Sequence, residues 1–134
     1  MDPTARPPDR SVTVLAAIGG LRVAVGLGLA ASPGVVLRLL PGARPSGTAE
    51  LLLRTLGLRD VVVGLATLTA ARRRDARGLA HWAAVGVLSD TADGLAGALA
   101  ARLVGRRGAA VVAASPLPFL AAGGWVLRSL RPVR

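Results

Sequence analysis

Four apolar segments, each about as long as a bilayer is thick, limit the fold of this chain more than any other feature. A helix needs roughly 20 apolar residues to cross the hydrocarbon layer. The segments cover residues 11–31, 49–71, 79–101 and 109–127. None of them carries a polar stripe along one full face, as a helix in a soluble bundle does. The sequence therefore predicts an all-α, integral membrane four-helix bundle over residues 11–130.

The composition also favours the lipid bilayer as the surroundings of the chain. Of the 134 residues, 52% are hydrophobic, the mean hydropathy is +0.55, and 17 glycines come in addition. Soluble domains reach about 45–50% apolar residues only when glycine is included. Aromatic residues make up only 2%, so a soluble core would lack its usual bulky side chains. We expect a multi-pass protein of the cell membrane.

The first ten residues differ in character from the apolar segments. Residues 1–10 are polar and rich in proline, which predicts a disordered N-terminal tail. A cleaved signal peptide is the alternative for the first apolar segment. However, Arg22 interrupts the apolar run, and the run is longer than the 7–15 residues of a typical signal-peptide core. We therefore interpret residues 11–31 as a membrane helix.

A short helix is predicted directly after the first membrane helix. Ser32 is a good N-cap residue, and Pro33 suits the first helical position. The apolar residues of 33–40 share one side, while Arg38 points elsewhere, which is typical of a helix that lies in the membrane interface. Thr48 is the predicted N-cap of the second long helix.

The arginines between the apolar segments predict the orientation, because basic residues in short loops favour the cytoplasmic side. All basic residues of the chain are arginines. Nine lie on the side of the termini: Arg6, Arg10, Arg72, Arg73, Arg74, Arg77, Arg128, Arg131 and Arg134. Five lie on the other side: Arg38, Arg44, Arg102, Arg106 and Arg107. Both termini are therefore expected in the cytoplasm.

Five charged residues fall close to the middle of the predicted membrane helices. They are Arg22, Arg59, Asp60, Asp90 and Asp93. With a rise of about 1.5 Å per residue, all five lie within several ångströms of the bilayer midplane. Each one would cost ~2.5–3.5 kcal/mol if it were left alone there. The five side chains are therefore predicted to meet inside the bundle.

The predicted cluster holds two arginines and three aspartates, so its formal charge is −1. Because arginine keeps its proton, the simplest neutral cluster has one protonated aspartate. Asp90 and Asp93 are spaced i and i+3 on one helix face, and we expect this pair to share the proton. Asp60, Asp90 and Asp93 are the candidate acid–base residues. Arg22 and Arg59 are the candidates for binding a substrate or stabilising negative charge.

Small residues and prolines lie beside these charges. Glycine lets membrane helices approach closely, and we expect six glycines to serve helix packing: Gly26, Gly57, Gly64, Gly86, Gly94 and Gly97. Pro116 and Pro118 interrupt the fourth segment. Proline frees backbone carbonyls and kinks a helix, so a cavity is expected beside the charged cluster.

Several functional classes are disfavoured. The net charge of +10 would suit nucleic acid, but the arginines lie in loops that can face anionic lipid, and there is no aromatic platform for bases. The chain has no Cys and one His, which predicts no metal site and no cofactor. The stretch "DTADGLAG" resembles the first half of the CDP-alcohol phosphotransferase motif. The second half requires two further aspartates, and no acidic residue follows Asp93.

The order of the features resembles a family of small four-helix integral membrane proteins of actinobacteria, whose function is unknown. The resemblance covers nearly the whole chain and is carried by "LRVAVGLGLAASPGVVLRLLPG", "LLLRTLGLRDVVVG" and "SDTADGLAG". The Gly-x-Arg-Asp and Asp-x-x-Asp elements are its most specific parts. It implies the membrane bundle and the charged cluster and leaves the activity open.

Three functions are compatible with this pattern. In the first interpretation, the cluster binds a small hydrophobic molecule or performs acid–base chemistry on it. Alternatively, the protein is a small proton-coupled transporter or channel and forms a homo-oligomer. In the third interpretation, the cluster is structural and fixes helix register, with or without a partner subunit. The sequence does not decide whether the protein is an enzyme.

Overall fold

The computed structural model describes residues 7–40, 46–99, 106 and 110–130. All regular elements in these ranges are helices, which confirms the all-helical prediction. They are α1 (Asp9–Ala31), α2 (Pro33–Leu39), α3 (Gly47–Arg72), α4 (Ala76–Leu99) and α6 (Leu117–Ser129). Residues 110–114 are also helical and lead into α6 through a turn at Ser115 and Pro116.

The observed helix ends differ from the predicted ones by a few residues. α1 already begins at Asp9, so it includes the last two residues of the predicted disordered tail, of which residues 1–6 lie outside the described part. The N-cap of α3 is Ser46, not Thr48, because the Ser46 hydroxyl accepts a hydrogen bond from the Ala49 N–H at 3.2 Å. Ser32 precedes α2 as expected, but its side chain makes no capping hydrogen bond. The predicted loop at 102–108 lies outside the described residues except for Arg106.

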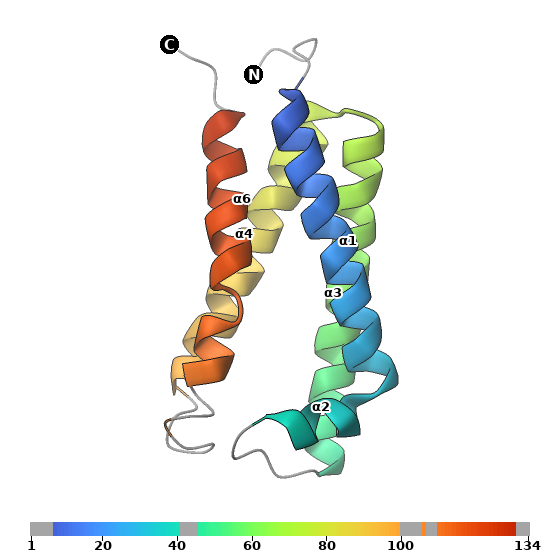
Figure 1. The fold of residues 1–134 in the computed structure, drawn as a ribbon, viewed down its shortest axis with the longest axis vertical. Helices are drawn as coiled ribbons and strands as arrows, with labels where there is room; N and C mark the ends of the chain where they lie inside the picture. Colours follow the sequence, from blue (N-terminus) through green and yellow to red (C-terminus); the bar gives the residue numbers. More distant parts are fainter. Residues whose placement is uncertain (1–6, 41–45, 100–105, 107–109, 131–134) are drawn as a thin grey trace.

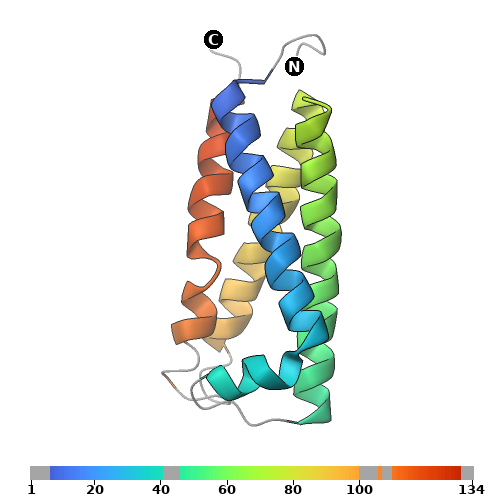
Figure 2. The same cartoon turned by 45° about the vertical axis from the view of Figure 1, so that its right-hand side comes forward.

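The long helices form two antiparallel pairs, α1 with α3 and α4 with α6 (Figures 1 and 2). In the first pair, glycines on one helix face glycines on the other. A Cβ atom on Gly26 would lie 2.5 Å from the Gly57 carbonyl oxygen, and a Cβ on Gly57 would lie 2.5 Å from that of Gly26. Gly19 and Gly64 meet in the same way, at 2.9 and 2.7 Å. The two backbones therefore touch directly at two levels, seven residues apart on each helix.

The second pair also has close contacts at glycine. A Cβ on Gly97 would lie 2.7 Å from the Val112 side chain, and one on Gly123 would lie 2.7 Å from the Val87 side chain. Gly94 has more space, because its nearest neighbour would be Pro116 at 3.5 Å. Gly123 was not among the glycines predicted to serve helix packing.

The hydrophobic core lies at the end of the molecule where α1 begins and α6 ends. Its buried residues are Leu15, Ala70, Ala71, Leu79, Ala83 and Val126. A hydrogen bond of 2.7 Å joins the hydroxyls of Ser11 and Ser129 at this end. The turn between α3 and α4 also lies here, and the Asp75 carboxylate caps α4 by accepting from the Arg77 N–H at 3.0 Å. The helix pairs are thus held together mainly at the end near the termini (Figure 1).

In the part of the chain that the structure describes, two helical stretches are long and apolar enough to cross a membrane: Asp9–Ala31 and Ala110–Ser129. By length and composition, they suggest that the protein associates with a membrane. α3 and α4 do not meet the same criterion, although the sequence predicted four spanning helices. Arg59 and Asp60 interrupt the apolar sequence of α3, and Asp90 and Asp93 interrupt that of α4.

Candidate functional site

The five charged residues singled out in the sequence meet between the two helix pairs. Arg22 comes from the middle of α1, Arg59 and Asp60 from α3, and Asp90 and Asp93 from α4. Their ion pairs form one continuous chain, which we call the charge network. Its order is Asp90, Arg22, Asp60, Arg59, Asp93. The network links three helices across the interface of the two pairs.

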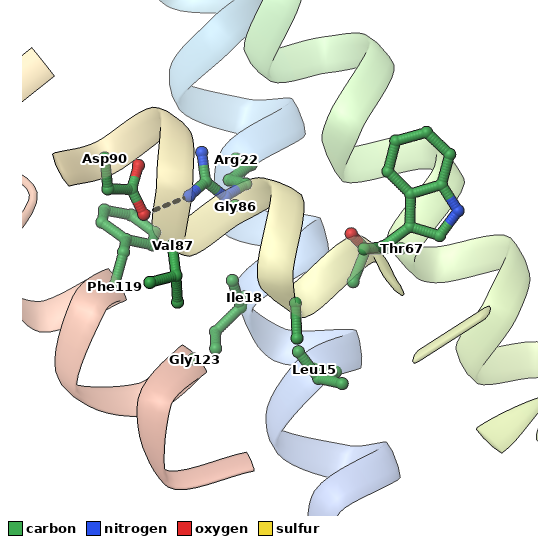
Figure 3. A pocket seen from close by; sticks show the side chains of 11 residues that line it. Leu15, Ile18, Arg22, Thr67, Gly86, Val87, Asp90, Phe119 and Gly123 are labelled. Atoms are coloured by element: carbon green, nitrogen blue, oxygen red, sulfur yellow. Dashed lines mark hydrogen bonds and ion pairs between the residues drawn. The ribbon is translucent and has the colours of Figure 1, made fainter. Parts of the chain in front are cut away.

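Arg22 holds the buried half of the charge network. Its Nη1 donates to Asp60 Oδ1 at 3.2 Å, and its Nη2 donates to Asp90 Oδ2. Arg22 and Asp90 are each only 4% exposed. The guanidinium carbon lies 5.1 Å from the centre of the Phe119 ring, which is a cation–π contact. Figure 3 shows the Asp90 carboxylate directed at Arg22, with Phe119 from α6 beside the pair.

Gly86 provides the space for this arrangement. A Cβ atom at this position would lie 3.3 Å from Arg22 Nη2. The α4 backbone can therefore approach the guanidinium closely enough for Asp90, one helical turn further along, to reach it. Gly86 thus makes room for a side chain, whereas Gly26 and Gly57 make room for a backbone.

Arg59 holds the more accessible half. Its two terminal nitrogens donate to both carboxylate oxygens of Asp93, at 3.0 and 2.6 Å, which is a bidentate pair. Its Nη2 also donates to Asp60 Oδ1 at 3.2 Å. The side chains of Arg59 and Asp93 are each 34% exposed. Among the described residues, Arg59 Nε is the one buried side-chain nitrogen or oxygen without a hydrogen-bond partner.

Asp90 and Asp93 do not use a common partner. The i, i+3 spacing places both on one side of α4, but Asp90 binds Arg22 and Asp93 binds Arg59. Each carboxylate therefore lies on a different guanidinium. The shared proton that the sequence predicts for this pair stays a prediction, and these contacts give it no support.

A cavity of about 160 Å³ lies directly beside the charge network. Four network residues form its polar wall: Arg22, Asp60, Asp90 and Asp93. The rest of the lining is mainly apolar and comes from Val25, Leu29, Leu56, Val112, Ser115, Pro116 and Phe119. The turn at Ser115 and Pro116 interrupts the helix that forms this wall. Pro118 lies just after the turn, at the start of α6, and is exposed.

A second space lies on the other side of Arg22 and is far smaller. Its volume is about 10 Å³, and Leu15, Thr67 and Trp82 contribute to its lining. A water molecule needs roughly 10–15 Å³ measured in this way, so there is room for one water at most. Figure 3 shows this space with the Arg22–Asp90 pair at its upper edge. The pair therefore separates the larger cavity from the packed end of the molecule.

Two carboxylate oxygens at the cavity have free hydrogen-bonding capacity. Asp60 Oδ2 and Asp90 Oδ1 accept no hydrogen bond from any described residue. Within the described ranges, no three acidic or histidine side chains are arranged to hold a metal ion. The groups available for chemistry are therefore carboxyl and guanidinium groups beside an apolar space.

Other polar residues near the site have local roles. The hydroxyls of Thr67 and Thr91 donate to carbonyl oxygens one turn back in their own helices. His81 is exposed and packs edge-on against Trp82, so it does not join the charge network. Sequence reasoning missed Phe119. The signal available was that Phe119 is the only phenylalanine of the chain and directly follows the second proline of the interrupted segment.

No protein-family model, no curated protein and no solved structure matches this chain. The likeness to the small actinobacterial membrane proteins therefore stays an expectation from the sequence. The geometry of the charge network and its cavity is the basis for inferring a function.

Proposed function

We propose that this chain is an integral membrane protein in which α1, α3, α4 and the segment Ala110–Ser129 each cross the bilayer. The distribution of side chains supports this, because large apolar side chains are exposed along the long helices and the charges near the middle of these helices pair with one another inside. Large exposed hydrophobic residues lie on every long helix, among them Leu21, Leu27, Leu58, Val62, Leu65, Leu88, Leu95 and Leu117. Soluble monomers rarely expose apolar surface on this scale.

The position of the charges supports the same proposal. Arg22 lies near the middle of α1 and Asp60 near the middle of α3. In a bilayer, both depths correspond to the hydrocarbon centre, where an unpaired charge costs about 2.5–3.5 kcal/mol. The ion pairs of the charge network offset that cost. A four-helix membrane bundle therefore accounts for the apolar exterior and for the buried charges together.

We further propose that the cavity binds a small hydrophobic molecule, which reaches it from the bilayer. The observation that carries this proposal is the lining of the cavity, which is charged on one wall and apolar on the other. Ligand sites commonly combine an apolar lining with a few polar groups that orient the ligand. Asp60, Asp90 and Asp93 are the candidate acids or bases. Arg22 lines the cavity and is the candidate for stabilising negative charge on a bound molecule, whereas Arg59 acts through its ion pairs with Asp60 and Asp93.

Binding of benzyl alcohol to the protein in lipid nanodiscs tests this proposal. The variant Val25→Phe adds a ring to the wall of the cavity, because Val25 lines it from α1. The matched control Val62→Phe adds the same ring on the outer face of α3, where Val62 is 61% exposed. We expect Val25→Phe to weaken binding at least tenfold and Val62→Phe to leave it unchanged. Equal binding by both variants, or no binding to the unmodified protein, would contradict the proposal.

A second candidate function is proton-coupled transport, and one observation favours it. The Arg22–Asp90 pair lies between the cavity and the small space of about 10 Å³, and both spaces are lined by Arg22, Asp90 and Phe119. An ion pair between a cavity and a space for one water has the layout of a gate on a proton path. Proton uptake into proteoliposomes that carry a pH dye measures this transport. Transport requires an uptake rate above that of empty liposomes and a large loss of that rate in Asp90→Asn.

A structural role for the charge network is the remaining alternative. All five charged groups have at least one ion-pair partner, as a network that only fixes helix register requires. Such a network needs no cavity beside it, so the benzyl alcohol experiment also separates this role from ligand binding.

A further inference from the structure

We propose that the ligand of the cavity is a small amphiphilic amine, with its ammonium group on the carboxylates of Asp60 and Asp90. The apolar part of the amine would lie against the wall that includes Phe119. This inference rests on the proposed ligand-binding function and adds the charge and the size of the ligand.

The charge balance of the network is the first argument. Two guanidinium groups face three carboxylates, so one negative charge is in excess. The other described residues that line the cavity, from α1, α3 and the segment Ala110–Ser129, carry no charge. An excess charge is costly in surroundings of low polarity. A bound cation removes the excess, a neutral ligand leaves it unchanged, and an anion doubles it.

The free carboxylate oxygens are the second argument. Asp60 and Asp90 contact the same guanidinium group, so their carboxylates lie next to each other. The Asp90 side chain is only 6% exposed, and it lines the cavity. Its Oδ1 and the Oδ2 of Asp60 accept no hydrogen bond from the described residues. An ammonium group has three donors and no acceptor, so it matches two adjacent acceptors that lack a donor.

The size of the cavity is the third argument. An engineered apolar cavity of about 150 Å³ holds a benzene molecule. The cavity beside the charge network measures about 160 Å³, so it accommodates one ring, or a chain of similar size, with the amine at its polar wall. Val25, Leu29 and Leu56 supply apolar contacts from the side opposite Phe119's helix.

Binding of an amine would also displace a proton. The sequence predicts one protonated aspartate in the empty cluster, and the bound ammonium group would take the place of that proton. The charged groups that line the cavity are Arg22 from α1, Asp60 from α3, and Asp90 and Asp93 from α4, and Arg59 pairs with Asp60 and Asp93 behind them. Calorimetry at pH 7 in two buffers of different ionisation enthalpy should therefore report release of about one proton per amine.

Three probes of nearly equal shape separate charge from size: benzylamine, benzyl alcohol and benzoate. Their binding is measured on the full chain in lipid nanodiscs, with empty nanodiscs as the reference for partitioning. We expect benzylamine to bind at least ten times more tightly than benzyl alcohol, and benzoate more weakly than both. Equal binding of benzylamine and benzyl alcohol would overturn the charge preference and leave the proposed ligand-binding function standing. Failure of all three to bind would overturn both.

Charge-neutral variants test the origin of the preference. Asp90→Asn and Asp93→Asn each remove the excess negative charge and leave two guanidinium groups with two carboxylates. Both should reduce the preference for benzylamine at least tenfold and abolish the proton release. The control Asp75→Asn removes a carboxylate at the α3–α4 turn, away from the cavity, and asparagine keeps the helix cap. A loss of the preference in the control as well, or in neither network variant, would refute the assignment.

Discussion

At the scale of single residues, Arg22 is the residue on which the charge network depends most. It is 4% exposed and binds carboxylates from two other helices. Without it, three carboxylates would face one guanidinium group, and Asp90 would lose its only ion-pair partner among the described residues. Removing one partner of a buried ion pair generally costs about 3–5 kcal/mol.

We therefore predict that Arg22→Gln lowers the stability of the protein by several kcal/mol, on the order of that buried-pair value. Thermal unfolding in detergent, followed by circular dichroism, measures the loss. The control is Arg74→Gln, since Arg74 pairs with Asp9 at a site where the two side chains are 53% and 80% exposed. Exposed pairs contribute about 1 kcal/mol or less. Similar losses in both variants would show that the Arg22 pairs are no more important than a surface pair.

The aspartates should respond differently from the arginines. Asp90→Asn leaves two guanidinium groups and two carboxylates, so it removes the excess negative charge while the amide oxygen still accepts a hydrogen bond from Arg22. We predict that Asp90→Asn reduces the unfolding temperature by much less than Arg22→Gln does. The same unfolding experiment gives both values. A loss in Asp90→Asn as large as that in Arg22→Gln would contradict the idea of an excess carboxylate.

Depth along the predicted helices was enough to bring the five charged residues together, because a residue's position in a helix fixes its height in the bundle. Depth alone did not predict which aspartate pairs with which arginine. The pairing of Asp93 with Arg59, and of Asp90 with Arg22, depends on the rotation of α4 against the other pair of helices. The contact of Phe119 with Arg22 could not be predicted for a related reason, since it depends on the direction that α6 takes after Pro116.

At the scale of elements, α1 and α3 carry the same pattern. Gly19, Arg22 and Gly26 have the same spacing as Gly57, Asp60 and Gly64. Because the helices are antiparallel, Gly19 meets Gly64 and Gly26 meets Gly57, and the ion pair between Arg22 and Asp60 lies between the two glycine contacts. The close contacts of the backbones thus set the separation at which the two charged side chains meet.

This arrangement predicts opposite effects for two glycine substitutions on one helix. In Gly26→Ala, the new methyl group would lie 2.5 Å from the Gly57 carbonyl oxygen, so α1 and α3 must move apart, at a cost of about 1–3 kcal/mol. In Gly28→Ala, nothing lies within 4 Å of the new atom, and alanine should stabilise the helix by about 0.5–1 kcal/mol. Chemical unfolding of the two variants measures whether each substitution lowers or raises the free energy of unfolding. A neutral or stabilising Gly26→Ala would mean that the helices do not approach this closely.

The helix bounds were predictable to within a few residues from the apolar runs and the prolines. The errors lie at the helix ends, because a local capping hydrogen bond decides at which residue a helix begins. Ser46 caps α3 because its side chain reaches the Ala49 N–H, and nothing in the sequence separates it from Thr48. Arg74 adopts a left-handed backbone, φ 51°, in the α3–α4 turn, which is an uncommon conformation for a residue with a side chain. Such features depend on how the flanking helices meet.

At the scale of the whole molecule, the packed core and the cavity occupy different parts. The buried apolar residues gather where α1 begins and α6 ends, and the cavity lies beside the charge network and towards α2. Figures 1 and 2 show the two helix pairs closest together near the termini and α2 at the opposite end. The core lies apart from the cavity, so the proposed ligand binding would leave the packing of the core unchanged.

The orientation of the proposed membrane bundle can be tested because the chain contains no cysteine. Six described arginines lie at the end near the termini: Arg10, Arg72, Arg73, Arg74, Arg77 and Arg128. Three lie towards the other end: Arg38, Arg54 and Arg106. Because the cytoplasmic side carries the excess of basic residues, we predict that the α3–α4 turn faces the cytoplasm and the start of α3 faces outwards.

Two single-cysteine variants leave every charge in place. Gly47→Cys lies at the exposed start of α3 with nothing within 4 Å of its Cβ, and Ala76→Cys lies at the start of α4. A membrane-impermeant maleimide should label Gly47→Cys in intact cells and Ala76→Cys only after permeabilisation, while the cysteine-free protein stays unlabelled. The reverse pattern would invert the orientation. Labelling of both variants in intact cells would mean that α3 does not cross the bilayer, and the membrane bundle would then have to be abandoned.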